Sequence, residues 1–249
     1  GRRARPTASG WIMGYNWNWG VLLQPVATGE AATYLGWILH GLLLTAALTL
    51  SAWLLALFVG TAFGILRAWP SRLCDAVGAT YVSLFRNVPL IVQFFIWFFV
   101  VPEVLPTVVG DWIKSITPST QVFIVSVLAL GFFTGARICE QVRAGIAALP
   151  DGQVQAAQAL GLTRLQTFRL VLLPQCFRRI LPPLTSEFLI ISKNSAVAST
   201  IGLLELSGQA RQLVDFTAQP YESFIVVTLA YIGLNVVILR LMEWIQRRS

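Results

Sequence analysis

Five ionisable residues lie within the apolar stretches of this chain, where a charge is costly. They are Arg86, Arg137, Glu140, Glu187 and Lys193. A charged side chain at the centre of a membrane-spanning helix costs about 2.5–3.5 kcal/mol on insertion scales, so it faces a helix bundle or a water-filled cavity and is a candidate for function. Three cations against two anions give this set a net charge of +1, which is weakly consistent with an anionic substrate.

Arg137 and Glu140 are three residues apart, so they share one face of a helix. Two interpretations remain open for them. They form either an ion pair that holds the helix in place or a gate or substrate group in the inner half of a cavity.

Arg86 lies about midway along an apolar stretch, just before Asn87 and Pro89. Pro89 frees a backbone carbonyl about one turn earlier and can kink the helix there. An arginine beside such a kink suits bidentate capture of a carboxylate, as a dicarboxylic amino acid would offer. The alternative is an ion pair with Glu140 or Glu187 that holds helices together.

Lys193 and Asn194 lie in another apolar stretch. Lys193 could meet a substrate carboxylate or pair with Glu187, but those two are six residues apart, a poor spacing for one helix face. The candidate substrate path is therefore Arg86, Asn87, Arg137, Glu140, Glu187, Lys193 and Asn194.

The composition indicates that these residues belong to a membrane protein. Of 249 residues, 56% are hydrophobic and 12% are charged, whereas a soluble domain has about 25% charged residues. This excludes a disordered protein, a nucleic-acid-binding arm and an ordinary water-soluble enzyme. The net charge of +7 implies no anionic partner, because basic residues concentrate in the cytoplasmic loops of membrane proteins.

Five stretches are long and apolar enough to cross a bilayer, which takes about 20 residues. Helices satisfy the backbone hydrogen bonds of such stretches within lipid. The fold class predicted is an all-α integral membrane protein with five transmembrane helices. These predicted spans are residues 37–66, 76–101, 121–148, 183–204 and 224–239.

The distribution of arginine and lysine predicts the orientation. Eleven of them lie on one side of these spans and two on the other, so the first side is cytoplasmic by the positive-inside rule. The C-terminus is then cytoplasmic and the N-terminus periplasmic. The eleven are Arg67, Arg72, Arg137, Arg143, Arg164, Arg169, Arg178, Arg179, Arg240, Arg247 and Arg248, and the two are Lys114 and Arg211.

The start of the chain departs from this rule. Residues 13–36 are expected to form a periplasmic N-terminal segment and residues 37–249 the transmembrane domain. Arg2, Arg3 and Arg5 would then lie outside, and the chain begins with Gly rather than Met. We expect residues 1–12 to be an upstream extension or a cloning remnant; a genuine basic tail is the alternative.

Residue counts exclude several kinds of site. The chain has one histidine, His40, and three scattered cysteines, so a histidine zinc pair or a Cys-x-x-Cys site cannot form. Neither lysine belongs to a Gly-x-x-x-x-Gly-Lys phosphate loop. We therefore expect no cofactor and no metal in this chain, and any ATP and Mg²⁺ to be held by a partner.

Residues 150–174, called the elbow below, interrupt the apolar pattern between the third and fourth spans. Residues 153–160 (QVQAAQAL) favour a short helix with a small-residue face. Gly161 favours its end, because glycine readily takes the left-handed conformation. Residues 162–173 favour a second short helix that returns to the membrane.

The elbow also carries apolar side chains that so short a segment cannot bury, among them Leu160, Leu162, Leu165 and Phe168. One interpretation is a knob that fits a groove on a cytoplasmic protein. The other is an elbow packed on its own helix ends.

The elbow sequence QAAQALGLTRLQTFRLVLLPQ resembles the EAA loop of ATP-binding-cassette (ABC) importer permeases, with the pattern E-A-A-x-x-L-G and a later L-P. FRNVPLIVQFF, EQVRAGIAALP, LPPLTSEF and KNSAVASTIGLLEL resemble the polar amino-acid branch of that family. With NWNWGVLL and TYLGWI, the resemblance runs from about Met13 to the end and is closest to glutamate/aspartate permease subunits. Gln155 stands where the family usually has Glu, which puts in doubt a salt bridge to the ATPase but not the docking.

The resemblance implies a type I ABC importer permease fold whose elbow is a helix-turn-helix coupling loop. It implies a subunit of the bacterial inner membrane that forms the translocation path for acidic or polar amino acids. The implied partners are a second, related permease subunit, two ATPase subunits that dock on the elbows, and a periplasmic amino-acid-binding protein. The implied ATPase-coupling residues are Gln155, Ala156, Ala157, Leu160, Gly161, Leu165 and Phe168.

Two other interpretations remain. A membrane-embedded enzyme could use Arg86, Arg137 and Glu140 around a lipid-like substrate, although the missing metal ligands and the single histidine argue against it. A purely structural assembly subunit is the other.

Overall fold

The computed structural model describes residues 15–30 and 32–248, so the expected extension at residues 1–12 lies outside the described residues. Within that part of the chain the regular structure is helical, apart from one isolated antiparallel bridge between Pro25 and Thr33. The all-α fold class is confirmed.

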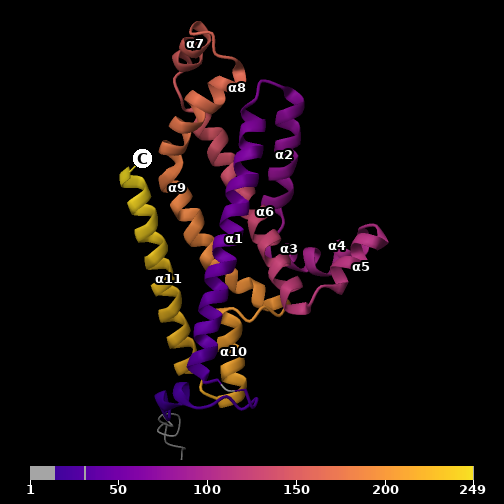
Figure 1. Cartoon of the computed structure of the whole chain (residues 1–249), viewed down its shortest axis with the longest axis vertical. Helices are drawn as coiled ribbons and strands as arrows, with labels where there is room; N and C mark the ends of the chain where they lie inside the picture. The colour runs from indigo at the N-terminus through magenta and orange to yellow at the C-terminus, as the bar shows by residue number, and fades with distance from the viewer. Residues whose placement is uncertain (1–14, 31, 249) are drawn as a thin grey trace, which may run out of the picture.

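Three helices are long and apolar enough to cross a membrane: α1 (Tyr34–Ala68), α6 (Pro118–Ala147) and α11 (Pro220–Arg248). Two further pairs of helices are each bent at a short break. If each bent pair is counted as one membrane span, the described residues contain up to five spans. Figure 1 shows these helices roughly side by side along the long axis of the molecule. The bundle thus has the predicted number of spans when the bent pairs are included.

The second predicted span, residues 76–101, is wrong as a single straight helix. Helix α2 (Arg72–Asn87) ends there, and the chain turns by 104° into Leu90–Val104. Val88, the residue before Pro89, is extended with φ −96° and ψ 127°, because proline disfavours the helical conformation of its predecessor. The predicted kink is therefore a full break.

Beyond this break, three short helical segments follow one another and lead to α5 (Thr107–Ser115). They are α3 (Leu90–Phe95), the π-helical turn η2 (Ile96–Val100) and α4 (Val101–Val104). In Figure 1 α4 and α5 project from the side of the bundle. An ion pair between Lys114 Nζ and Glu103 Oε1, 2.6 Å apart, joins α5 to α4.

The elbow contains one separate short helix, α7 (Asp151–Ala159), followed by a turn. The predicted second elbow helix is present from Arg164, but it is not a separate short helix, and the helix that contains the predicted fourth span begins well before residue 183. A single helical run extends from Arg164 to Ile201. Its parts are α8 (Arg164–Thr167), the π turn η3 (Phe168–Leu172), α9 (Leu173–Asn194) and the 3-10 turn η4 (Ser195–Ile201).

Pro174 does not end the helix, because it lies in the first turn of α9 directly after η3. A proline in a helix clashes with the preceding turn and removes a hydrogen bond. The wider π turn before it accommodates both effects. After Ile201 the chain bends by 49° into α10 (Leu206–Thr217).

Helices α1 and α6 approach each other at glycines. A Cβ at Gly60 would lie 2.7 Å from the Gly135 carbonyl oxygen, and one at Gly64 would lie 2.6 Å from Val142 Cβ. Small residues allow the close backbone contact by which membrane helices pack. The largest buried cluster surrounds this contact and includes Leu48 and Leu130.

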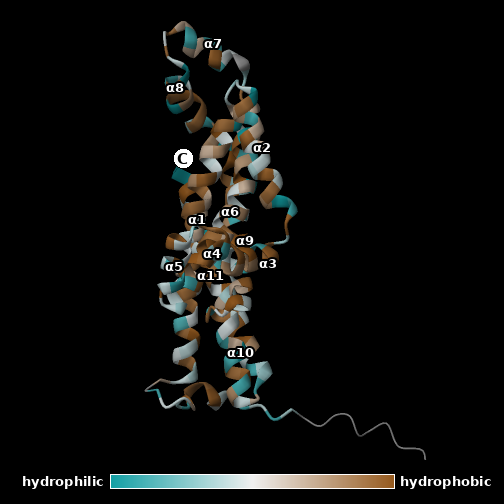
Figure 2. Ribbon diagram, turned by 90° about the vertical axis from the view of Figure 1, so that its right-hand side faces the viewer, coloured by the Kyte–Doolittle hydropathy of each residue, from teal (hydrophilic) through white to brown (hydrophobic). Residues whose placement is uncertain are grey.

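The two ends of the molecule differ. Figure 1 places α7 and α8 at one end, and α10 at the other. The 3-10 turn η1 (Trp19–Leu23) belongs to the N-terminal segment, which packs against the start of α1. Figure 2 shows hydrophobic residues concentrated on the helices between these ends.

Candidate translocation pocket and coupling elbow

Four of the seven predicted path residues line one cavity between α2, α6 and α9. Its volume is about 430 Å³, and its lining is Arg86, Phe133, Arg137, Glu140, Gln141 and Glu187. Small-molecule sites are typically about 300–1,000 Å³. We call this cavity the charged pocket.

Arg137 pairs across the pocket rather than along its own helix. Its Nε lies 2.8 Å from Glu187 Oε2 on α9, and Gln141 Nε2 donates to Glu187 Oε1 at 3.0 Å. Of the two interpretations left open for Arg137 and Glu140, the ion pair between them is therefore not formed. The side chain of Glu187 is only 6% exposed, and a carboxylate at that depth requires a counter-charge, which Arg137 supplies.

Glu140 has other partners. Arg67 Nη1 at the end of α1 pairs with its Oε1, and Arg143 Nη2 lies 3.0 Å from its Oε2. Arg67 also reaches Asp75 of α2, with 3.1 Å between Nε and Oδ1. From the sequence, Arg67 counts only among the basic residues of the cytoplasmic side, and its contact with Glu140 on another helix was not predicted.

Arg86 lines the pocket but makes no ion pair with any described residue. The expected alternative, a helix-joining pair with Glu140 or Glu187, is not formed. Its neighbour Asn87 lies outside the pocket lining and donates from Nδ2 to Ser83 Oγ at 3.2 Å. Arg86 thus keeps donors available to a ligand.

Lys193 and Asn194 are not brought to the charged pocket. They occupy the last turn of α9, where Lys193 is exposed and Asn194 half-buried. The considered pair of Lys193 with Glu187 does not form, because Glu187 is held by Arg137.

Two buried acceptors on the pocket wall receive no hydrogen bond from the described residues: Glu187 Oε2 and Gln141 Oε1. Arg137 Nε lies close to Glu187 Oε2, yet its N–H is not aligned for a hydrogen bond. Buried acceptors normally have donors. Of the two, Glu187 Oε2 is held in the ion pair with Arg137, so Gln141 Oε1 is the wall acceptor that has neither a hydrogen bond nor an ion pair with a described residue.

The elbow presents most of the predicted coupling residues to its surroundings. Leu160 is 81% exposed and Leu165 68%, and Gln155, Ala156 and Gly161 are also exposed. Gly161 has φ +77°, so the predicted left-handed end of the first elbow helix is confirmed.

Ala157 and Phe168, in contrast, are buried. The Phe168 ring centroid lies 5.2 Å from that of Trp69, just after α1, so Phe168 is buried by residues outside the elbow rather than by the elbow itself. The elbow combines both interpretations, because it packs on a helix end through Phe168 and still exposes Leu160 and Leu165.

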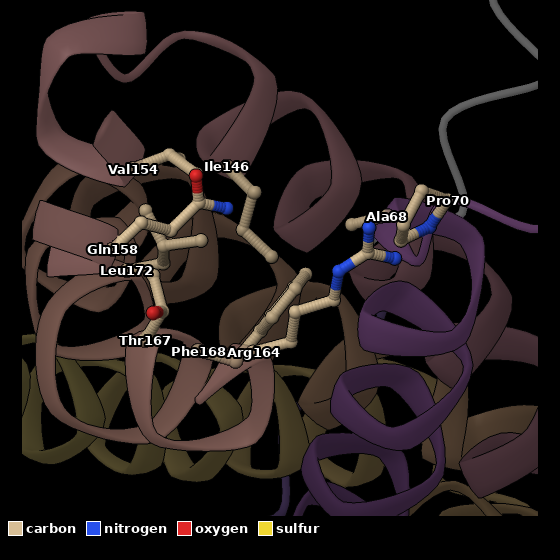
Figure 3. A pocket seen from close by; sticks show the side chains of 9 residues that line it. All are labelled: Ala68, Pro70, Ile146, Val154, Gln158, Arg164, Thr167, Phe168 and Leu172. Atoms are coloured by element: carbon tan, nitrogen blue, oxygen red, sulfur yellow. The ribbon is translucent and has the colours of Figure 1, made fainter. Parts of the chain in front are cut away.

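A smaller cavity of about 270 Å³ separates the elbow from the turn between α1 and α2. Figure 3 shows the Arg164 side chain extending toward Ala68 and Pro70 across this cavity. The elbow and the end of α1 are thus neighbours with space between part of their surfaces.

A further buried carboxylate, Glu205, lies at the opposite end of the molecule. It caps α10 by accepting from Gly208 N at 2.9 Å, and it accepts from Tyr231 Oη of α11 at 2.5 Å. Nothing in its local sequence indicates this contact, because Tyr231 is distant in the chain.

Comparison with known proteins gives the family. Residues 60–249 match the family model described as "Binding-protein-dependent transport system inner membrane component". The glutamate/aspartate import permease protein GltJ of Escherichia coli K12 is 51% identical over 237 residues, which cover 95% of this chain and 96% of that protein. The glutamate/aspartate import permease protein GltK of Escherichia coli O6:H1 is 26% identical and covers 86% of this chain and 94% of its own.

A solved structure of an amino acid ABC transporter with histidines has a TM-score of 0.71 and 28% identity, and the match covers 87% of this chain and 95% of that one. These proteins are transporter subunits, so the interpretation as a membrane-embedded enzyme is set aside. The chain belongs to the family of binding-protein-dependent transport system inner membrane components, the permease subunits of ABC importers.

Proposed function

We propose that this chain is the permease subunit of a bacterial ABC importer for acidic amino acids, glutamate and aspartate foremost. The similarity to GltJ extends over nearly the whole of both chains. The charges of the pocket agree with such a substrate.

The observation that carries the proposal is the set of unmatched groups in the charged pocket. The charge of Glu140 is neutralised by Arg67 and Arg143, which leaves Arg86 and Arg137 against Glu187. An acidic amino acid carries two carboxylates and one ammonium. Arginine suits carboxylate, and Gln141 Oε1, which accepts no hydrogen bond from a described residue, suits ammonium.

The remaining predicted residues extend the proposed path. Asn87 lies one residue beyond Arg86, at the end of α2, and Lys193 and Asn194 lie at the end of α9. We place them along the route to the charged pocket rather than in it.

The partners we propose follow the family. The exposed elbow residues Leu160 and Leu165 dock in a groove on an ATPase subunit, and the buried Ala157 and Phe168 support them from below. Two ATPases hold ATP and Mg²⁺ and move the elbows as they close. A second permease related to GltK pairs with this chain, and a periplasmic binding protein delivers the amino acid.

The orientation we propose places the elbow and the C-terminus in the cytoplasm and the N-terminal segment in the periplasm. The eleven basic residues on one side of the spans, against two on the other, support it.

The test is ATP-dependent uptake of labelled glutamate into proteoliposomes that contain this chain with its second permease, ATPases and binding protein. Uptake should require the loaded binding protein, and Arg86→Ala should abolish it while the complex still assembles. Arg240→Ala is the matched control, because Arg240 is 75% exposed and pairs with Glu243 on its own helix. No glutamate or aspartate uptake by the unaltered complex would refute the proposed substrate, and normal uptake by Arg86→Ala would remove Arg86 from the site.

A further inference from the structure

The last turn of α1 joins three helices through one arginine. The Arg67 side chain is 13% exposed and reaches Asp75 on α2 and Glu140 on α6. Its aliphatic part fills the space beside Gly78 on α2, where even a Cβ would collide with it. The Arg67 guanidinium is therefore fixed between two carboxylates on different helices.

The same turn of α1 also contacts the elbow. Trp69 and Ala68 pack against the buried cluster that contains Phe168 and Leu172. The Trp69 and Phe168 ring centroids are 5.2 Å apart, at an interplanar angle of 33°. Trp69, which contacts the elbow, and Arg67, which contacts Glu140, are therefore two positions apart, with only Ala68 between them.

Glu140 in turn lines the charged pocket. While Arg67 and Arg143 hold it, its charge is compensated and the pocket retains a surplus of positive charge. If the end of α1 moves with the elbow, Arg67 moves relative to α6. Glu140 then keeps Arg143 as its counter-ion and loses Arg67, so the positive charge beside the pocket falls and a carboxylate there is attracted less strongly.

We propose that Arg67 is a positioning residue that couples elbow movement to the charge of the pocket. The inference rests on the proposed function, since it assigns a regulation of the same site. The proposal predicts that a variant with a weaker contact between Arg67 and Glu140 hydrolyses ATP but transports less substrate for each ATP hydrolysed. It does not require Arg67 to touch the substrate.

The experiment measures glutamate uptake and ATP hydrolysis in the same proteoliposomes, with the complete importer and its loaded binding protein. Arg67→Gln should preserve assembly and ATP hydrolysis in the absence of binding protein, and should lower uptake per ATP hydrolysed about tenfold. Arg240→Gln, which removes an exposed arginine from another helix, should leave the ratio unchanged.

A purely structural role gives a different pattern. If uptake per ATP hydrolysed is unchanged in Arg67→Gln, whether or not both rates fall, the proposal is overturned. If Arg67→Gln does not assemble, Arg67→Lys decides, because one ammonium keeps the charge but lacks the guanidinium fork that reaches two carboxylates. A ratio like that of the unaltered protein in Arg67→Lys overturns the proposal, and an intermediate ratio supports it. Absence of uptake in the unaltered complex would instead refute the proposed function.

Discussion

Glu187 is the most deeply buried carboxylate of the charged pocket, and Arg137 is its counter-ion. Removing one partner of a buried ion pair costs about 3–5 kcal/mol, because the other charge remains uncompensated, whereas replacing both with apolar residues can be neutral. Arg137 is 38% exposed, so solvent screens part of this cost. Removing Arg137 alone should therefore destabilise the protein more than replacing Arg137 and Glu187 together.

Arg137→Leu should consequently lower the free energy of unfolding by about 2–3 kcal/mol. The double variant Arg137→Leu with Glu187→Leu should lose less than this single variant. The measurement is the unfolding midpoint of the purified chain in detergent. A double variant as unstable as Arg137→Leu alone would contradict the assignment of Arg137 as the counter-ion.

The residue types of the pocket could be predicted from the sequence, but their partners could not. Arg86, Arg137, Glu140 and Glu187 stand out because charge is costly in apolar stretches. Which of them pair depends on which helices are neighbours, and the sequence does not show that α9 packs beside α6. The contact of Arg67 with Glu140 was missed for the same reason.

At the scale of the elements, the close contact of α1 and α6 is built on glycines that have no room for a side chain. Overpacking such a contact costs about 1–3 kcal/mol. Gly233 on α11 provides a matched control, because a Cβ there would meet nothing within 4 Å.

Gly60→Ala should therefore lower the unfolding midpoint of the chain in detergent, whereas Gly233→Ala should leave it nearly unchanged. The reason is that a Cβ at Gly60 would lie 2.7 Å from both the Gly135 carbonyl oxygen and Ile138 Cβ. Equal midpoints for the two variants would contradict the described packing of α1 on α6.

The turn of the elbow depends on Gly161, whose φ of +77° favours glycine. Gly161→Ala should strain this turn by about 1 kcal/mol and lower uptake per ATP hydrolysed by the importer. Gly152→Ala on α7 is the control, since it adds the same methyl group in open space at an ordinary φ. Identical uptake per ATP in both variants would show that the turn geometry does not matter for coupling.

The bends of the elements were only partly predictable. Pro89 indicated a kink, but the 104° turn also depends on Phe94, which is fully buried in the main cluster after the break. Pro174 stands at the end of the elbow, yet the π turn before it lets the helix continue into α9. In both cases tertiary packing decides how the chain passes a proline.

At the scale of the whole molecule, the fold separates the elbow from the N-terminal segment at opposite ends of the helices (Figure 1). The charged pocket lies on α2, α6 and α9, and the contact of Arg67 with Glu140 links it to the elbow end of α1. The proposed importer requires that the elbow lie on the side of the ATPases, where ATP is available.

The most direct test of this requirement is labelling with a membrane-impermeant maleimide in a cysteine-free background. Single cysteines are placed at Leu160 in the elbow, 81% exposed, and at Leu23 in the N-terminal segment, 71% exposed. In sealed right-side-out vesicles that contain the chain with its second permease but lack the ATPases, Leu23→Cys should react and Leu160→Cys should not, and inverted vesicles should reverse the pattern. Reaction of Leu160→Cys from the outside would contradict the proposed orientation and the coupling of this chain to a cytoplasmic ATPase.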